Sequence, residues 1–217
     1  MNKEVSSAGS SDALLGGWLL GLAGFVDAVA FVVLQGSFVA FMSGNTTILG
    51  SSATTGDWHL AWLSTLLIVL FFAGNVTGAA VGRWGGSAAH RMLMILIAAV
   101  TILGTVVANT VSVSGGLVVI AVAAGLINSA LAADTDVHVG LTYVTGTLVK
   151  AAHQLIAGIG AEHPWGWVKT LGFWTAFVVG AAVGGLAFHR LGAASLWFAA
   201  AFAVAACLLP HCSTPGD

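Results

Sequence analysis

The chain has 217 residues, of which 58% are hydrophobic and only 6% are charged, and its mean hydropathy is +0.99. Soluble domains carry about 25% charged residues, so this composition predicts an integral membrane protein whose main partner is the lipid bilayer. The formal net charge of -2 offers no basic surface for phosphate groups. We therefore expect no nucleic-acid partner.

Six apolar runs of about 20 residues are long enough to cross a hydrocarbon core as helices. They follow a Ser-rich hydrophilic stretch over residues 1–12, which we expect to be a cytoplasmic tail. We predict a first membrane repeat over 13–111, a second over 112–210 and a C-terminal tail over 211–217. The apolar runs cover residues 13–34, 60–82, 92–111, 115–133, 168–188 and 193–209.

Two further stretches, 37–53 and 139–157, are apolar at their edges and polar in the middle. The first contains Phe41-Met42-Ser43-Gly44-Asn45-Thr46, and 102 residues later the second contains Tyr143-Val144-Thr145-Gly146-Thr147-Leu148. Glycine frees the backbone from helical dihedral angles, and the hydroxyl and amide groups beside it can cap the helix that follows. Polar breaks at matching positions in two apolar segments predict a binding site formed by both.

The surroundings of these breaks are duplicated as well. The element Gly24-Phe25-Val26-Asp27-Ala28 matches Gly125-Leu126-Ile127-Asn128-Ser129, at an offset of 101 residues. The sequence Gly78-Ala79-Ala80-Val81-Gly82 recurs letter for letter from Gly180 to Gly184. A unit of roughly one hundred residues is therefore used twice in tandem.

The topology depends on whether the two broken stretches cross the membrane. If both cross, each repeat has four spans and the halves are parallel; if both re-enter, each repeat has three and the halves are inverted. With the N-terminus inside and both stretches re-entrant, only Arg190 lies outside, as the positive-inside rule favours. The other five of the six basic residues then lie on or near the cytoplasmic side: Lys3, Arg83, Arg91, Lys150 and Lys169.

We therefore predict an all-α integral membrane protein built from two inverted repeats. Each repeat has three transmembrane helices and one broken or re-entrant helical segment. The alternative is a pair of parallel repeats with four spans each, which divides the basic residues equally between the two sides.

Asp27 lies inside the first apolar run, where an ionised carboxylate is costly unless it is paired or reaches water. We predict a proton or cation relay or a substrate contact at this residue. The alternative is a carboxylate that neighbouring helices hold for assembly. Its repeat partner Asn128 is neutral, so the two halves of the site differ chemically.

Lys150 and His153 follow the second break by one and two helical turns, and their equivalents Ile48 and Ser51 are uncharged. Lys150 can add positive charge at the break, pair with Asp27, or extend to the cytoplasmic interface. His153 is a weaker candidate for the same site.

Other polar groups carry no expected cofactor or metal. Asp134, Asp136 and His138 form a short cluster that we interpret as a solvated turn. Cys207 and Cys212 have no second pair to complete a zinc site, so we expect packing residues or free thiols.

Glycines at small-x-x-x-small spacing predict close helix approach. We expect them to pack helices within one chain, with a homodimer as the alternative. They are Gly74, Gly78, Gly82, Gly180 and Gly184.

Three segments together resemble the YoaK-type family of bacterial polytopic inner-membrane proteins, a domain of unknown function. They are Gly24-x-x-Asp27-Ala28, the stretch from Phe38 to Asn45, and the stretch from Thr142 to Leu148. Ser43 stands where the family usually has Thr, and the acidic turn replaces basic residues ahead of the second break. The resemblance covers nearly the whole chain and implies a bacterial inner-membrane protein of about six spans, without an assigned substrate.

From these features we expect a small transporter or channel that moves a small solute or ion through a central site. The two breaks form that site, and Asp27 provides proton coupling. A membrane-embedded enzyme using Ser43 or His153 is an alternative, but no Gly-x-Ser-x-Gly or His-Glu-x-x-His motif is present and we expect no enzymatic activity. A scaffold or sensor that pairs through its glycine-lined helices is the third hypothesis.

Overall fold

The computed structural model describes residues 2–133, 144–159 and 164–208, and the regular structure in these ranges is entirely helical. The helices are α1 (Asn2–Val33), α2 (Met42–Thr55), α3 (Trp58–Trp84), α4 (Ala89–Thr110), α5 (Val113–Ala133), α6 (Val144–Ala157), α7 (Gly166–Leu191) and α8 (Leu196–Ala206). Two short 3-10 turns, η1 (Gly86–Ala88) and η2 (Gly192–Ser195), precede α4 and α8. The all-α prediction is confirmed.

Among the described residues, five stretches are long and apolar enough to cross a membrane. They are Ala13–Val33, Trp58–Trp84, Gly86–Thr110, Val113–Ala132 and Gly166–Ala206. The last of these includes α7, the turn η2 and α8. Helix α8 itself has 11 residues, about 16 Å of helix, so it is shorter than the run predicted over residues 193–209.

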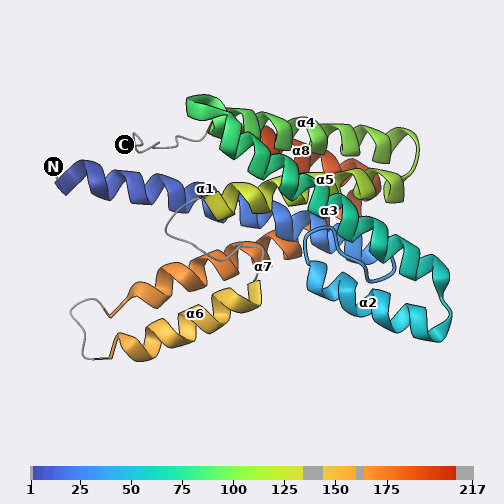
Figure 1. Cartoon of the computed structure of the whole chain (residues 1–217), viewed down its shortest axis with the longest axis horizontal. Helices are drawn as coiled ribbons and strands as arrows, with labels where there is room; N and C mark the ends of the chain where they lie inside the picture. The colour runs from blue at the N-terminus through green and yellow to red at the C-terminus, as the bar shows by residue number, and fades with distance from the viewer. Residues whose placement is uncertain (1, 134–143, 160–163, 209–217) are drawn as a thin grey trace.

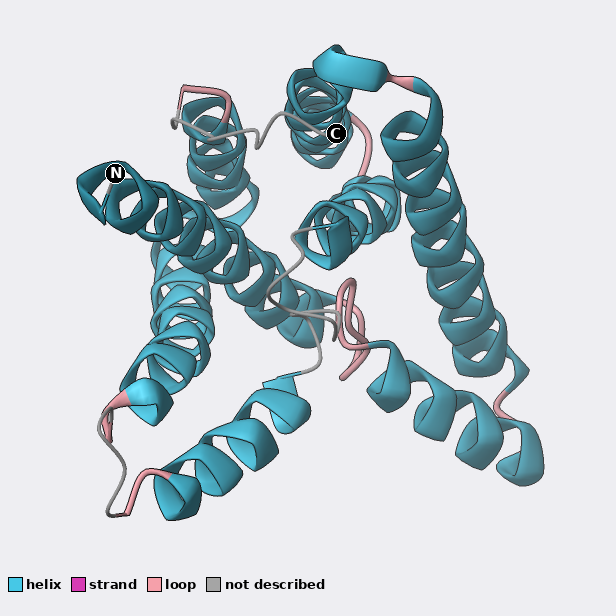
Figure 2. Cartoon of the chain, turned by 60° about the vertical axis from the view of Figure 1, so that its left-hand side comes forward, coloured by secondary structure: helices cyan, strands magenta, loops and turns pink. Residues whose placement is uncertain are grey.

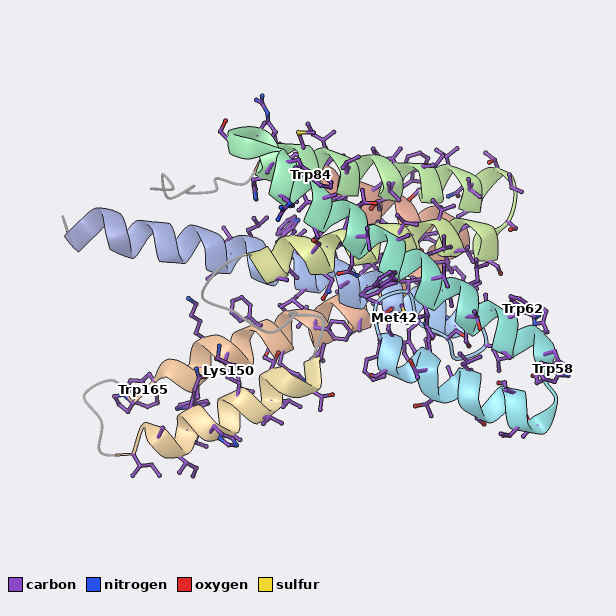
Figure 3. The ribbon with its side chains drawn as sticks, in the orientation of Figure 1. Met42, Trp58, Trp62, Trp84, Lys150 and Trp165 are labelled. Atoms are coloured by element: carbon purple, nitrogen blue, oxygen red, sulfur yellow. The ribbon has the colours of Figure 1, made fainter. Side chains whose placement is uncertain are left out.

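The long helices run side by side, and the short helices α2 and α6 differ from them in where they begin (Figure 1). Both short helices have 14 residues and start near the middle of the molecule's length. From there α2 runs outward to one end and α6 to the opposite end (Figures 1 and 2). Figure 3 shows the start of α2 at Met42 between Trp165 at one end and Trp58 and Trp62 at the other.

Two helix pairs, α1 with α7 and α3 with α5, have backbones in direct contact. A methyl group on Gly180 would overlap the carbonyl oxygen of Gly21, and one on Gly24 would overlap that of Phe177. In the second pair, Gly74 faces the Val122 carbonyl in the same way. Such contacts are possible only where no Cβ is present, as in helix packing within membranes.

Three more glycines lie in these two interfaces. Gly184 lies against the backbone of Phe25, Gly125 against the carbonyl of Phe71, and Gly78 against the side chain of Ser129. Gly82 differs, because no atom of the described residues lies within 4 Å of the position that its Cβ would take. Close packing on α3 therefore involves Gly74 and Gly78 and does not extend to Gly82.

Candidate functional site

The segment between α1 and α2 is a non-helical loop over residues 34–41 that lies largely inside the protein. The chain turns after α1 at Gln35 and Gly36, whose φ angles are 55° and 89°. Val39 and Ala40 are then buried. Non-helical backbone at membrane depth is tolerated only when its polar groups are satisfied inside the protein or by water.

The Asp27 side chain accepts hydrogen bonds from two backbone amides of this loop. Its Oδ1 accepts hydrogen bonds from the backbone amides of Val39 at 2.8 Å and Ala40 at 2.7 Å. The side chain is only 4% exposed, and its Oδ2 is buried without a hydrogen-bond partner in the described part of the chain. The carboxylate therefore holds the loop with one oxygen, and the other is buried without a hydrogen bond to a described residue.

Asn45 holds the same loop from the other side. Its Oδ1 accepts from the amide of Phe38 at 2.9 Å, and its Nδ2 donates to the carbonyl of Phe38 at 2.7 Å. Asn45 thus pairs with both backbone polar groups of Phe38, as a residue on an adjacent β-strand would. Its side chain is fully buried. Asp27 and Asn45 thus fix successive residues of one loop from two different helices.

An aromatic cluster covers the first turn of α2. The ring of Phe38 lies 5.5 Å from that of Phe31 and 5.2 Å from that of Phe41, measured between centroids. Gly44 is beneath the rings of Phe38 and Phe41, which would lie 2.5 to 2.9 Å from an added Cβ. The glycine of the first break is therefore needed for close contact with aromatic rings.

We expect Gly44→Ala to destabilise the protein by about 1–3 kcal/mol, because both rings must shift to admit the methyl group. Gly50→Ala on the same helix is the matched control, since nothing lies within 4 Å of its Cβ position. Thermal unfolding of the purified proteins in detergent measures the difference. Equal melting temperatures would contradict a role of Gly44 in packing.

The second break begins α6. Thr147, which matches Asn45 in the repeat, is buried, whereas Thr145 is exposed and Gly146 is half-buried. Tyr143 lies outside the described residues, so its predicted contribution is not part of the observed site. Asn128, the counterpart of Asp27, donates from Nδ2 to Oδ1 of Asn75 at 2.7 Å and so joins α5 to α3.

The structure corrects where the breaks lie within their helices. The sequence predicts polar breaks that precede and cap the helix that follows, but Ser43 and Gly44 are in the first turn of α2. The N-cap is Phe41, which makes no side-chain capping bond, and Asn45 reaches back to the loop instead. The exposed Ser43 caps nothing, and the Thr46 hydroxyl donates to the Met42 carbonyl one turn earlier.

The charged candidates on α6 do not join the Asp27 side of the site. Lys150 and His153 are both exposed, and Figure 3 shows Lys150 on the part of the molecule away from Met42. Among the described residues, the Asp27 carboxylate accepts hydrogen bonds from backbone amides and forms no ion pair with Lys150. The acidic turn at Asp134, Asp136 and His138 lies outside the described residues.

Sequence reasoning missed the loop residues that Asp27 binds and the ring of Phe31 that helps to cover them. The turn residues Gln35-Gly36-Ser37 were the available signal, because Gly flanked by polar residues is typical of a chain reversal. Ser37 is fully buried, and its hydroxyl has no partner in the described structure. The loop is thus part of the site, although its sequence is mostly apolar.

Comparison with known proteins places these features in a family context. A family model described as a protein of unknown function, DUF1275, matches residues 15–209. The chain is also similar to a UPF0700 transmembrane protein of Rhizobium meliloti (strain 1021), with 27% identity over 178 residues that cover 81% of this chain and 76% of that protein. No solved structure matches. These findings confirm the resemblance to YoaK-type proteins, which are members of that family.

Proposed function

The chain belongs to the DUF1275 family, and we propose that this member is a small transporter or channel for a small polar solute or ion. The observation that carries the proposal is the pair of short helices α2 and α6, which start near the middle of the molecule's length and run to opposite ends (Figures 1 and 2). Half-helices that meet at the midplane from opposite faces form the substrate sites of many secondary transporters.

We infer that the two halves are inverted repeats with three spans and one re-entrant helix each. The glycine contacts support this relationship. On α1, Gly24 contacts the α7 backbone at Phe177 and Ala181. On α5, Gly125 contacts the α3 backbone at Phe71 and Asn75 in the same way. The two glycines are 101 residues apart, and both pairs of partners are 106 apart. Matching glycine contacts at two helix interfaces are what repetition of one structural unit produces.

The arrangement of charge supports an N-terminus on the cytoplasmic side of a bacterial inner membrane. Arg83 ends α3, Arg91 and Lys169 begin α4 and α7, and these helix ends lie at the N-terminal end of the molecule (Figure 1). Arg190 lies at the other end of α7. Basic residues concentrate on the cytoplasmic side of membrane proteins.

The exposed face of α2 indicates the chemistry of the solute. Hydroxyls of Thr46, Thr47, Thr54 and Thr55 all donate to carbonyls within the helix, so their remaining hydrogen-bonding capacity is acceptance. A solute that donates hydrogen bonds, such as a polyol or an ammonium compound, fits this surface. We therefore assign the α2 side of the pathway to a hydrogen-bond donor.

Asp27 gives this pathway a coupling step. When Asp27 is ionised, its carboxylate accepts strong hydrogen bonds from the backbone amides of Val39 and Ala40. A proton on Oδ2 weakens both hydrogen bonds. The loop that closes over the start of α2 is then released. Proton binding and opening of the α2 side are linked in this mechanism.

Cysteine accessibility tests the re-entrant geometry. In a background in which Cys207 and Cys212 are changed to Ser, Thr46→Cys and Thr145→Cys place thiols on exposed positions of α2 and α6. A membrane-impermeant thiol reagent is added to right-side-out or inside-out vesicles. We expect labelling of Thr46→Cys only from the outside and of Thr145→Cys only from the cytoplasmic side.

Val69→Cys is the matched control, because Val69 is 55% exposed on the membrane-crossing helix α3 and faces lipid in this arrangement. It should remain unlabelled from both sides. Labelling of both test positions from the same side would overturn the inverted arrangement, and so would epitope tags that report eight crossings.

A further inference from the structure

A long apolar groove runs between α1, α7 and α8, away from the loop that Asp27 holds. Its volume is about 950 Å³, and its lining includes Gly17 and Trp18 of α1, Val183 and Leu186 of α7, and Phe198 of α8. On α7 the lining extends from Gly172 to Leu191, which is roughly 28 Å of helix and close to the thickness of a hydrocarbon core. The groove therefore follows the membrane from one side to the other.

Side-chain size sets the distance between the backbones of α1 and α8 here. Trp18 of α1 stacks on Phe202 of α8 at 4.0 Å between ring centroids, and its Nε1 donates to the Phe202 carbonyl at 2.9 Å. In contrast, α4 and α5 meet through Gly104 and Gly116, each facing the other's carbonyl oxygen. An aromatic pair separates two helix backbones where a glycine pair joins them.

Among the described residues that line the groove, Arg190 is the one that carries a charge. It follows Val183 by seven residues and Leu186 by four, so the three share a face of α7. The guanidinium is exposed and forms no ion pair with a described carboxylate. Arg190 thus places an exposed positive charge at one end of the apolar groove, whose length is close to the thickness of a hydrocarbon core.

We propose that this groove binds an anionic phospholipid, with its phosphate on Arg190 and an acyl chain along Leu186 and Val183 toward Trp18. Guanidinium binds phosphate through paired, charge-assisted hydrogen bonds, and the apolar walls suit a hydrocarbon chain. The lipid closes the gap between α7 and α8 and so completes the wall of the bundle. This assignment does not depend on what the central site carries.

Native mass spectrometry of the delipidated protein, with phosphatidylglycerol or phosphatidylcholine added in turn, tests the proposal. We expect preferential retention of phosphatidylglycerol and about five-fold weaker retention in Arg190→Gln. Arg190→Lys should retain part of the preference because it keeps the charge. Arg83→Gln removes the same charge from a residue outside the groove and should behave as wild type.

Val183→Trp tests the acyl-chain path. Val183 is 52% exposed and lines the groove, so the indole occupies the path without entering the protein core. Val178→Trp is matched, since Val178 is 41% exposed on the same helix and does not line the groove. We expect only Val183→Trp to lower lipid retention.

Equal retention of the two lipids by the wild type would overturn the proposal, as would unchanged retention in both Arg190→Gln and Val183→Trp. Loss of a dimer in Val183→Trp, without loss of lipid, would assign the groove to a second copy of the chain instead. Displacement of the bound lipid by inorganic phosphate would also contradict it, because the chain contacts would then contribute nothing.

Discussion

Asp27→Asn is expected to insert and fold but to lose the pH response of the loop over residues 34–41. Ser37→Cys reports opening of that loop, because Ser37 is fully buried and its hydroxyl has no hydrogen bond to lose in the described structure. With Asp27 present we expect the labelling rate of this cysteine, divided by that of a free thiol at the same pH, to rise about ten-fold as the pH falls, since charge-assisted bonds exceed neutral ones by roughly 1.4 kcal/mol. With Asn at position 27 this normalised rate should not change with pH.

The physical reason is that Asn keeps the acceptor and loses the ionisable oxygen. Its carbonyl can still accept from the amides of Val39 and Ala40, so the loop stays closed. Asp27→Ala removes both bonds and leaves two buried amides unpaired, at a cost of about 1–3 kcal/mol each. That variant should be labelled rapidly at every pH.

The surroundings of Asp27 make this comparison specific. Helices α5, α7 and α8 pack on α1, and α2 follows the loop. Of these, α2, α5 and α8 contain no titratable residue, and those of α7 stand toward its two ends at Lys169, His189 and Arg190. A pH response that persists in Asp27→Asn would show that another group titrates and would refute the coupling role.

The membrane helices could be predicted from the sequence because their signal is local. A run of apolar residues must form helix in a bilayer, since the backbone has no other hydrogen-bond partner there. The loop over residues 34–41 could not be predicted in the same way. Its Phe38-Val39-Ala40-Phe41 stretch is as apolar as a helix, and what makes it non-helical is the satisfaction of its amides by Asp27 and Asn45.

The glycine pattern shows a second limit. The repeated sequence aligns Gly78 with Gly180 and Gly82 with Gly184. In the structure, however, the glycine of α3 that contacts a neighbouring carbonyl as Gly180 does is Gly74. The difference is four residues, about one helical turn. A helix can slide by one turn and present the same face, so the sequence alignment alone does not fix which glycine meets the neighbouring backbone.

Gly180→Ala is expected to destabilise the fold by about 3 kcal/mol, because its methyl group meets the Gly21 carbonyl and a backbone cannot move aside as a side chain can. Gly185→Ala on the same helix should be neutral or slightly stabilising, since its Cβ position is open and Ala favours helix. Intrinsic tryptophan fluorescence during heating in detergent gives both melting temperatures.

The same experiment on α3 shows whether destabilisation follows the observed helix contacts or the positions of the repeated sequence. Gly74→Ala should be as harmful as Gly180→Ala because it meets the Val122 carbonyl, whereas Gly82→Ala should resemble Gly185→Ala. If Gly82→Ala is instead as destabilising as Gly74→Ala, α3 packs closely along all three glycines and a second copy of the chain must cover the outer one. If both pairs behave as expected, the two halves use one packing rule in different registers, as two inverted copies of one unit would.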